Sequence, residues 1–174
     1  AWREAGLAPA LLPTWRPDRA LAVQEPGAFN AWVDRLGAAA GLDVRTVAHF
    51  WDALARRHAA FDALGCRASD HGLEVIDEAE VTGAELGRTF DEARAGRVPA
   101  PEACARWRAG LLHRFAVMDA ERGWVQQFHL GALRNTNTRM RRTLGPDTGF
   151  DSIGDFEVAR PLARFLDRLD DTNQ

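Results

Sequence analysis

Side chains able to bind and transform a ligand gather at three places along the chain, each directly after a short apolar stretch. They are Arg16 and Asp18, then Asp70 and His71, then His129, Arg134, Asn135 and Asn137. Arginine pairs with carboxylates, asparagine and aspartate hydrogen-bond hydroxyl groups, and histidine transfers protons near neutral pH. This combination indicates a site for an anionic ligand rich in hydroxyl groups.

Each group also has a purely structural interpretation. Arg16 could form an ion pair with Asp18 or Asp70, and the segment Asp70-His71-Gly72 could be a turn whose aspartate accepts backbone hydrogen bonds. His129 could be a core histidine with satisfied hydrogen bonds. The three remaining histidines lie within helical patterns and are expected to be structural or exposed: His49, His58 and His113.

The arginine-rich stretch from Arg134 to Arg142 does not indicate a nucleic-acid site. It holds four arginines among asparagines and threonines but lacks the aromatic platforms that stack on bases. The formal net charge of -3 gives no general attraction to nucleic acids or anionic membranes. Apolar runs fall far short of the roughly 20 residues that span a bilayer. We interpret the stretch as a loop reaching over an acidic substrate.

No complete metal site is predicted within these residues. The sequence contains no His-x-His, His-x-x-x-His or Cys-x-x-Cys spacing, which are common arrangements of metal ligands. His71 or His129 could supply one ligand, but neither is predicted to do so. Two cysteines, Cys66 and Cys104, are too few for a disulfide framework, so we expect a cytoplasmic protein in which both are buried.

Three short apolar stretches are predicted to be buried strands: Ala8–Thr14, Cys66–Ser69 and Trp124–Leu130. Helical segments separate them, and strands joined by helical crossovers form parallel sheets with helices packed outside. Active sites of such folds lie where the carboxyl ends of the strands meet. The polar groups that follow the three strands should therefore come together there.

Apolar residues at helical spacing predict the crossovers and a last helix. The stripes are Phe29-Val33-Leu36, Val47-Phe50-Leu54-Phe61-Leu64, Trp107-Leu111-Phe115-Met118 and Ile153-Val158-Leu162-Phe165-Leu169. Thr82 with Glu85 predicts a capping box, and Pro101 suits the first turn of the next helix. Gly65 and Gly123 directly follow helical patterns and are expected to end those helices.

We predict one α/β domain over residues 1–174. Three strands cannot close a (β/α)8 barrel, which needs eight, and alone they leave two exposed sheet edges. An open three-stranded α/β domain is one alternative. A segment of a TIM-type barrel, with about three parallel strands and long helical crossovers, explains the pattern better.

Five phrases together resemble the uronate isomerase family, also called glucuronate isomerases. They are LPTWRPD at 12–18, GCRASDHG at 65–72, GWVQQFHLGALRN at 123–135, NTRM at 137–140 and LGPDTGFDSIGD at 144–155. One phrase would be a weak signal. All five occur in the family's order and spacing and span nearly the whole chain.

The resemblance implies an amidohydrolase-like barrel enzyme of carbohydrate metabolism. Such enzymes interconvert D-glucuronate with D-fructuronate and D-galacturonate with D-tagaturonate, moving a proton between C2 and C1 while the carbonyl is polarised. It implies that Arg16 helps to hold the substrate carboxylate. The assigned set is Asp70, His71 and His129 as catalytic residues, and Arg16, Arg134, Asn135, Asn137 and Asp151 as substrate-binding residues.

The sequence also departs from this family. Family members are much longer, and two of their motifs are missing here: the His-x-His of the first barrel strand and the Asp-x-Arg of the last. The resemblance implies a divalent metal in the intact enzyme, zinc in preference to others, with ligands mostly outside this chain. It further implies a hexuronate substrate, with a homo-oligomer as one option. Two alternatives stay open: an amidohydrolase-like hydrolase of another acidic substrate, and a non-catalytic α/β binding domain.

Overall fold

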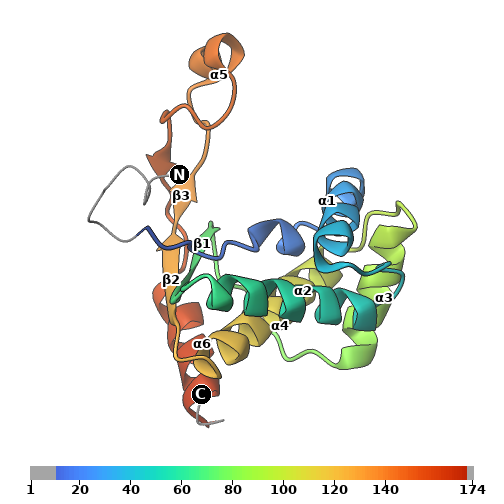
Figure 1. The fold of residues 1–174 in the computed structure, drawn as a ribbon. Coiled ribbons are helices and arrows are strands. Elements are labelled where there is room, and N and C mark those ends of the chain that lie inside the picture. The colour runs from blue at the N-terminus through green and yellow to red at the C-terminus, as the bar shows by residue number, and fades with distance from the viewer. Residues whose placement is uncertain (1–10, 172–174) are drawn as a thin grey trace, which may run out of the picture.

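The computed structural model of the chain describes residues 11–171. It is a mixed α/β structure in which helices predominate (Figure 1). In chain order the elements are η1 Asp18–Leu21, α1 Pro26–Ala40, α2 Val47–Ala63, β1 Ala68–Leu73, α3 Gly83–Arg94, α4 Pro101–Ala120, β2 Val125–Leu130, β3 Ala132–Leu133, α5 Thr138–Leu144, β4 Ser152–Ile153 and α6 Ala159–Asp171.

A parallel pair of strands forms the structural centre. β1 and β2 pair along their whole lengths, in a register that places Ala68 opposite Val125. Trp15 adds one parallel bridge on the other side of β1, opposite Ser69. Its N–H donates to the Ala68 carbonyl at 3.1 Å, and the Asp70 N–H donates to the Trp15 carbonyl at 3.0 Å. Three chain segments therefore run parallel, in the order Trp15, β1, β2.

The strand predictions hold unevenly. The stretch Trp124–Leu130 forms β2 from Val125 onward, but it is not the buried strand predicted, because the residues of β2 alternate between exposed and half-buried. The stretch Ala8–Thr14 lies partly outside the described residues; positions 11–14 form no strand, and only Trp15, just beyond them, pairs with β1.

The second predicted strand, Cys66–Ser69, is displaced along the chain. β1 begins at Ala68 and continues through Leu73, so the strand does not end at Ser69 as predicted, and Asp70-His71-Gly72 does not form the turn considered as an alternative. A run of polar side chains usually marks the end of a strand. Asp70 and His71 stay within β1 because each has polar partners on its own face of the sheet.

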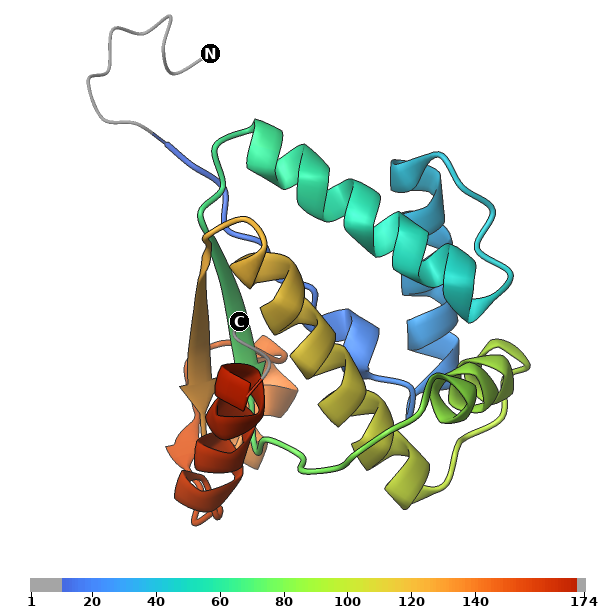
Figure 2. The ribbon, with the colours of Figure 1, turned by 90° about the horizontal axis from the view of Figure 1, so that it is seen from below.

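The two faces of this sheet are covered differently. Side chains alternate along a strand, so Ser69 and His71 point toward α4, where both are fully buried. In β2, Phe128 points the same way and packs against Phe165 of α6, with ring centroids 5.6 Å apart. The opposite face is open, and Val125 there is 66% exposed. Figure 2 shows α4 and α6 beside the strands on the covered side.

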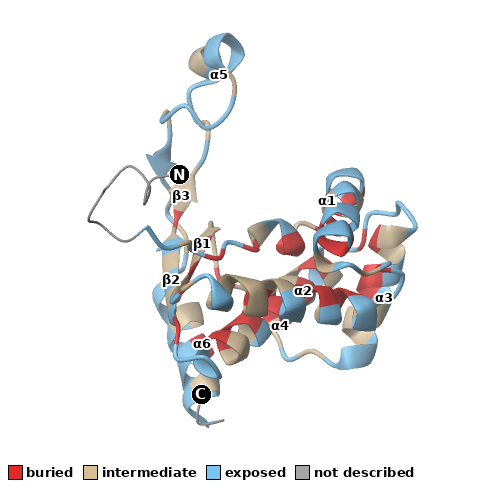
Figure 3. Ribbon diagram, viewed as in Figure 1, coloured by how far each residue is buried: buried red, intermediate tan, exposed pale blue. Residues whose placement is uncertain are grey.

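The main core lies between the helices and the covered face of the sheet (Figure 3). Aromatic rings from α1, α2, α3 and α4 meet there in tilted and edge contacts at about 5–6 Å. Most of the predicted helical stripes are buried as expected: Phe29, Val33, Leu36, Phe50, Leu54, Trp107, Leu111, Phe115 and Phe165. Cys66 and Cys104 are buried too, as predicted.

Two of the predicted apolar stripes extend beyond the helices that they were expected to mark. Leu64 is 67% exposed because it is the C-cap of α2, where the chain turns away from the core. Ile153 is 90% exposed because it lies in β4, and the last helix begins only at Ala159. Hydrophobic spacing alone does not report where a helix ends.

The predicted helix ends agree better. Thr82 and Glu85 form the capping box of α3, and Pro101 occupies the first turn of α4. Gly65 follows the C-cap of α2 with a φ of 88°, a left-handed value that glycine tolerates. None of the helices between residues 11 and 171 has the length and apolarity needed to cross a membrane.

Residues 131–154 form an arm that extends away from the helices (Figure 1). β3 and β4 pair antiparallel at its base, and α5 lies at its far end. No residue of α5 is buried. The arm therefore begins directly where β2 ends and carries the Arg134-to-Arg142 stretch away from the core.

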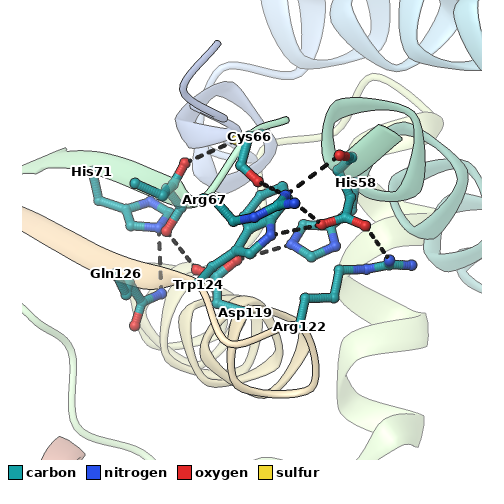
Figure 4. A network of polar contacts seen from close by, with 11 residues as sticks. His58, Cys66, Arg67, His71, Asp119, Arg122, Trp124 and Gln126 are labelled. Carbon is teal, nitrogen blue, oxygen red and sulfur yellow. Dashed lines mark hydrogen bonds and ion pairs between the residues drawn. The ribbon is translucent and has the colours of Figure 1, made fainter. Parts of the chain in front are cut away.

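A buried polar network fixes the covered face of β1 to two helices (Figure 4). Asp119 of α4 accepts a hydrogen bond from the Ser69 hydroxyl at 2.5 Å and contacts Nε2 of His58 in α2 at 2.9 Å. The His58 ring lies 4.0 Å from that of Trp124, measured between centroids. Ser69, His58 and Asp119 are each at most 1% exposed. His58 is thus structural, as predicted.

Replacing Asp119 should destabilise the fold strongly. Asp119→Ala leaves a buried histidine N–H and a buried hydroxyl without their acceptor, so we expect a loss of about 3–5 kcal/mol in the free energy of unfolding. Urea denaturation measures it. The matched control is Asp43→Ala, which breaks the exposed Arg45–Asp43 pair and should cost less than about 1 kcal/mol. Equal losses in the two variants would contradict a stabilising role for the network.

Candidate functional site

Arg16 lies at the carboxyl end of the parallel segments and binds two aspartates at once. Its Nε donates to Asp18 Oδ2 at 3.2 Å, and its Nη1 lies 3.2 Å from Asp70 Oδ2. Both ion pairs considered from the sequence therefore exist. Half of the side chain is nevertheless exposed, and Nη2 has no carboxylate partner within residues 11–171. Arg16 can thus receive an anion while its aspartates hold it.

Asp70 and His129 form a pair on the open face of the sheet. Asp70 Oδ1 accepts a 2.6 Å hydrogen bond from Nδ1 of His129. The second ring nitrogen, Nε2, faces the Gln127 amide at 3.4 Å, and the side chain is 52% exposed. His129 is therefore not a core histidine. The ring is held by a carboxylate at Nδ1, and because it is half-exposed, a ligand could replace the long Gln127 contact at Nε2.

His71 lies on the opposite face. It is fully buried, and its ring stacks on Phe115 of α4 with centroids 5.8 Å apart. Nδ1 contacts Asp18 Oδ1 at 2.9 Å, and Nε2 contacts the Gln126 amide nitrogen at 3.3 Å. Both ring nitrogens are occupied by protein groups. The structure thus separates His71 from Asp70 and His129, although the sequence grouped the three as catalytic residues.

Asp18 connects the two faces. Its Oδ2 accepts the Gly72 N–H at 2.8 Å in addition to Arg16, while its Oδ1 contacts His71. Burial alone would raise the pKa of Asp18. The hydrogen bonds from His71, Gly72 and Arg16 outweigh it and hold the pKa below its usual range. The sequence placed Asp18 near the site but assigned it no role.

Most of the predicted ligand-binding residues of the arm bind one another. Asp151 accepts from Arg134 Nη1 at 2.6 Å and from the Asn135 N–H at 2.9 Å. These two hydrogen bonds lower the pKa of Asp151, that from Asn135 most. Asn137 caps α5 by accepting the Met140 N–H at 3.0 Å. Asn135, Asn137 and Asp151 thus shape the arm, and Arg134 alone of the four lines the opening described next.

A hollow of about 710 Å³, hereafter the arginine hollow, opens beside Arg16. Its lining residues are Arg16, Asp18, Arg19, Trp32, Arg35, Gly72, Arg134 and Asp147. Four arginines face two aspartates, which favours an anionic occupant. A second hollow, of about 690 Å³, lies against α4 and α6 and holds none of the predicted site residues.

Sequence reasoning missed Arg19, Trp32 and Arg35 in the lining. Arg19 lies in η1, only three residues from Arg16, so proximity could have signalled it. Trp32 and Arg35 are three apart on α1, which places them on one side of that helix. That spacing gives no indication of which opening the side faces, because α1 reaches the site only through the tertiary fold.

The described residues do not form a metal site. No group of three or more histidine, cysteine, aspartate or glutamate side chains between residues 11 and 171 is arranged to hold an ion. The two histidines nearest the site both use Nδ1 to contact an aspartate. A metal bound here would therefore need ligands from other parts of a protein.

Comparisons with known proteins identify the family of this chain. The family model of glucuronate isomerases matches residues 4–174. The uronate isomerase of Cellvibrio japonicus is 47% identical over 165 residues, 95% of this chain and 35% of that protein. That of Opitutus terrae is 46% identical over 172 residues, 99% of this chain and 36% of that protein. The chain spans about a third of the length of the curated relatives it matches.

Solved structures give the same result. The crystal structure of uronate isomerase from Thermotoga maritima superposes with a TM-score of 0.88 at 34% identity, over 97% of this chain and 38% of that one. Glucuronate isomerase from Caulobacter crescentus gives a TM-score of 0.82 at 28% identity, over 96% of this chain and 34% of that one. Sequence and backbone thus agree over nearly the whole length, and the chain belongs to the glucuronate isomerase family.

Proposed function

We propose that these residues form the substrate-facing middle part of a hexuronate isomerase. The reaction is an aldose–ketose isomerisation that converts D-glucuronate to D-fructuronate and D-galacturonate to D-tagaturonate. One observation carries the proposal: a half-exposed arginine, Arg16, stands beside the Asp70–His129 pair at the carboxyl end of a parallel sheet. Family membership supplies the reaction class.

The fold proposed for the complete enzyme is a (β/α)8 barrel, of which residues 1–174 form one continuous part. Helices cover one face of β1 and β2, as on the outside of a barrel, while the opposite face is left open with Val125 66% exposed. In a barrel that inner face packs against side chains from other strands. The TM-scores of 0.88 and 0.82 support a shared arrangement of these elements.

In this proposal the substrate carboxylate binds Arg16, with Arg134 as the second cation of the arginine hollow. An arginine pairs with a carboxylate through two parallel N–H groups. Arg16 uses Nε and Nη1 for its aspartates, which leaves Nη2 and the outer N–H of Nη1 for the ligand. The aspartates fix the guanidinium before the ligand arrives, so little side-chain entropy is lost on binding.

The Asp70–His129 pair is assigned to the oxygens next to the reacting carbons. Asp70 holds Nδ1 of His129, so Nε2 is the nitrogen that can donate or accept a hydrogen bond or a proton at a sugar hydroxyl or carbonyl. His71 is not assigned a contact with the substrate, because both its ring nitrogens are occupied inside the protein. Asn135, Asn137 and Asp151 are assigned to shaping the arm instead.

The divalent metal stays a prediction for the complete enzyme, with zinc preferred. The described residues do not fit such an ion, so no step is assigned to it here. Its ligands are proposed to come from barrel strands beyond these 174 residues. A cytoplasmic location and a homo-oligomeric state likewise stay predictions.

Arg16→Ala should damage substrate binding in the natural full-length gene product. Losing a charge-assisted pair with a carboxylate should raise KM for D-glucuronate about 10- to 100-fold, with a smaller effect on kcat. Steady-state kinetics measure both constants. The control is Arg45→Ala, whose side chain is 79% exposed and pairs with Asp43 away from the site; it should leave both constants unchanged. An unaltered KM in the Arg16 variant would remove the assigned role.

The 174-residue chain alone should not turn over substrate. We expect no ketose when the folded, purified chain is mixed with D-glucuronate and zinc or manganese, because the metal ligands are proposed to lie elsewhere. Proton NMR of the sugar follows the reaction directly, and circular dichroism checks that the sample is folded. Turnover by the chain alone would show that the essential residues lie within it.

A further inference from the structure

A chain of hydrogen bonds runs from the covered face of the sheet to the arginine hollow. It begins at Gln126, passes through His71 and Asp18, and ends at Arg16. The contact between Gln126 and His71 is visible in Figure 4. His71 is fully buried, Asp18 is 21% exposed and Arg16 is 50% exposed, so the chain leads from the core to solvent.

The partners of His71 define its proton arrangement. A carboxylate only accepts hydrogen bonds, so the contact with Asp18 makes Nδ1 the protonated nitrogen. The amide nitrogen of Gln126 only donates, so Nε2 accepts from it. Both ring nitrogens are thus engaged by protein groups inside the core. With no nitrogen left for a ligand, His71 can orient a carboxylate but does not contact the substrate.

Asp18, oriented by His71, in turn orients Arg16. With Oδ1 held by His71 and Oδ2 held by the backbone N–H of Gly72, the carboxylate cannot rotate without breaking a hydrogen bond. The same Oδ2 accepts from Nε of Arg16, so the plane of the carboxylate fixes the inner edge of the guanidinium. Asp70 holds the guanidinium at Nη1. Two carboxylates thus fix it, and His71 anchors one of them.

Gly72 leaves the space in which the guanidinium lies. A Cβ atom added at this position would stand 2.3 Å from Nη2 of Arg16, which is closer than any ordinary contact. Arg16 therefore lies directly over a strand residue without a side chain. A methyl group at position 72 would therefore displace the guanidinium from its present place and would also contact Arg134, whose Nη2 lies 3.7 Å from the same point.

We propose that His71 and Asp18 are positioning residues that, together with the gap at Gly72, set Arg16 for a substrate carboxylate. This inference rests on the proposed function. It reassigns His71 from catalysis to selectivity: the His71–Asp18 pair determines how well the site distinguishes a sugar acid from a neutral sugar of the same length. His71 does not line the arginine hollow and acts only through Asp18, whereas Gly72 lines the hollow next to Arg16.

The test uses the natural full-length gene product and two competitive ligands, D-gluconate and its neutral counterpart D-glucitol. His71→Leu removes the donor to Asp18, whereas His71→Asn keeps an N–H near the position of Nδ1. Gly72→Ala displaces Arg16 from the open face. Ser69→Ala is the control, because Ser69 lies two residues before His71 on the same buried face but its hydroxyl donates to Asp119 and not to Asp18.

We expect His71→Leu and Gly72→Ala to raise KM for D-glucuronate and the inhibition constant of D-gluconate about tenfold. The constant for D-glucitol and kcat should change less than about twofold. His71→Asn should recover most of the affinity. Ser69→Ala should lower the melting temperature without changing either inhibition constant. If His71→Leu does not fold, Gly72→Ala and His71→Asn still provide the comparison.

Two results would overturn the inference. One is an unchanged inhibition constant for D-gluconate in both His71→Leu and Gly72→Ala, when Arg16→Ala raises it. The other is an equal loss of D-gluconate and D-glucitol affinity in all variants, Ser69→Ala included, which would indicate general loosening of the sheet. The proposed function fails separately, if Arg16→Ala itself leaves D-gluconate binding unchanged.

Discussion

Successive side chains of a β-strand point to opposite faces of the sheet, and in β1 this alternation separates Asp70 from His71. The two polar residues are adjacent in sequence, and each takes part in an aspartate–histidine contact, yet their side chains lie on opposite faces of the sheet. Asp70 reaches the open face and pairs with His129 across the parallel register. His71 reaches the covered face and is fully buried. The parallel register therefore determines which groups a ligand can contact.

The covered face gives the open face its rigidity. Ser69 and His71 replace the apolar residues expected beneath a sheet, and each is hydrogen-bonded to an aspartate. Buried polar groups are costly unless they are paired, but a paired group fixes direction in a way that an apolar contact does not. Asp119 ties β1 to α2 and α4, and the position of the strand determines where Asp70 and Gly72 stand. The buried contacts on the covered face thus determine the positions of the groups on the open face.

Much of this arrangement is readable from sequence. The stripes of Phe29-Val33-Leu36 and Trp107-Leu111-Phe115 predict buried helix faces because burial follows helical periodicity. The capping box of Thr82 and Glu85 is confirmed because it depends only on residues three apart in sequence. Asp70-His71-Gly72 was misread because a polar run ends a strand unless tertiary partners satisfy it, and those partners are distant in sequence. The role of Asp18 and the lining by Trp32 and Arg35 depend wholly on such long-range contacts.

An arginine already paired with two aspartates is at first sight a poor anion receptor. Asp18 and Asp70 together outweigh the single charge of Arg16, so the trio taken alone would repel a carboxylate. The surroundings offset this negative excess. Arg19, Arg35 and Arg134 add three positive charges, against Asp147 in the lining and Asp151, which pairs with Arg134. The aspartates give Arg16 a fixed direction, while the other arginines cancel the repulsion that these aspartates would cause. Direction and charge balance thus come from different residues, and each can be varied without the other.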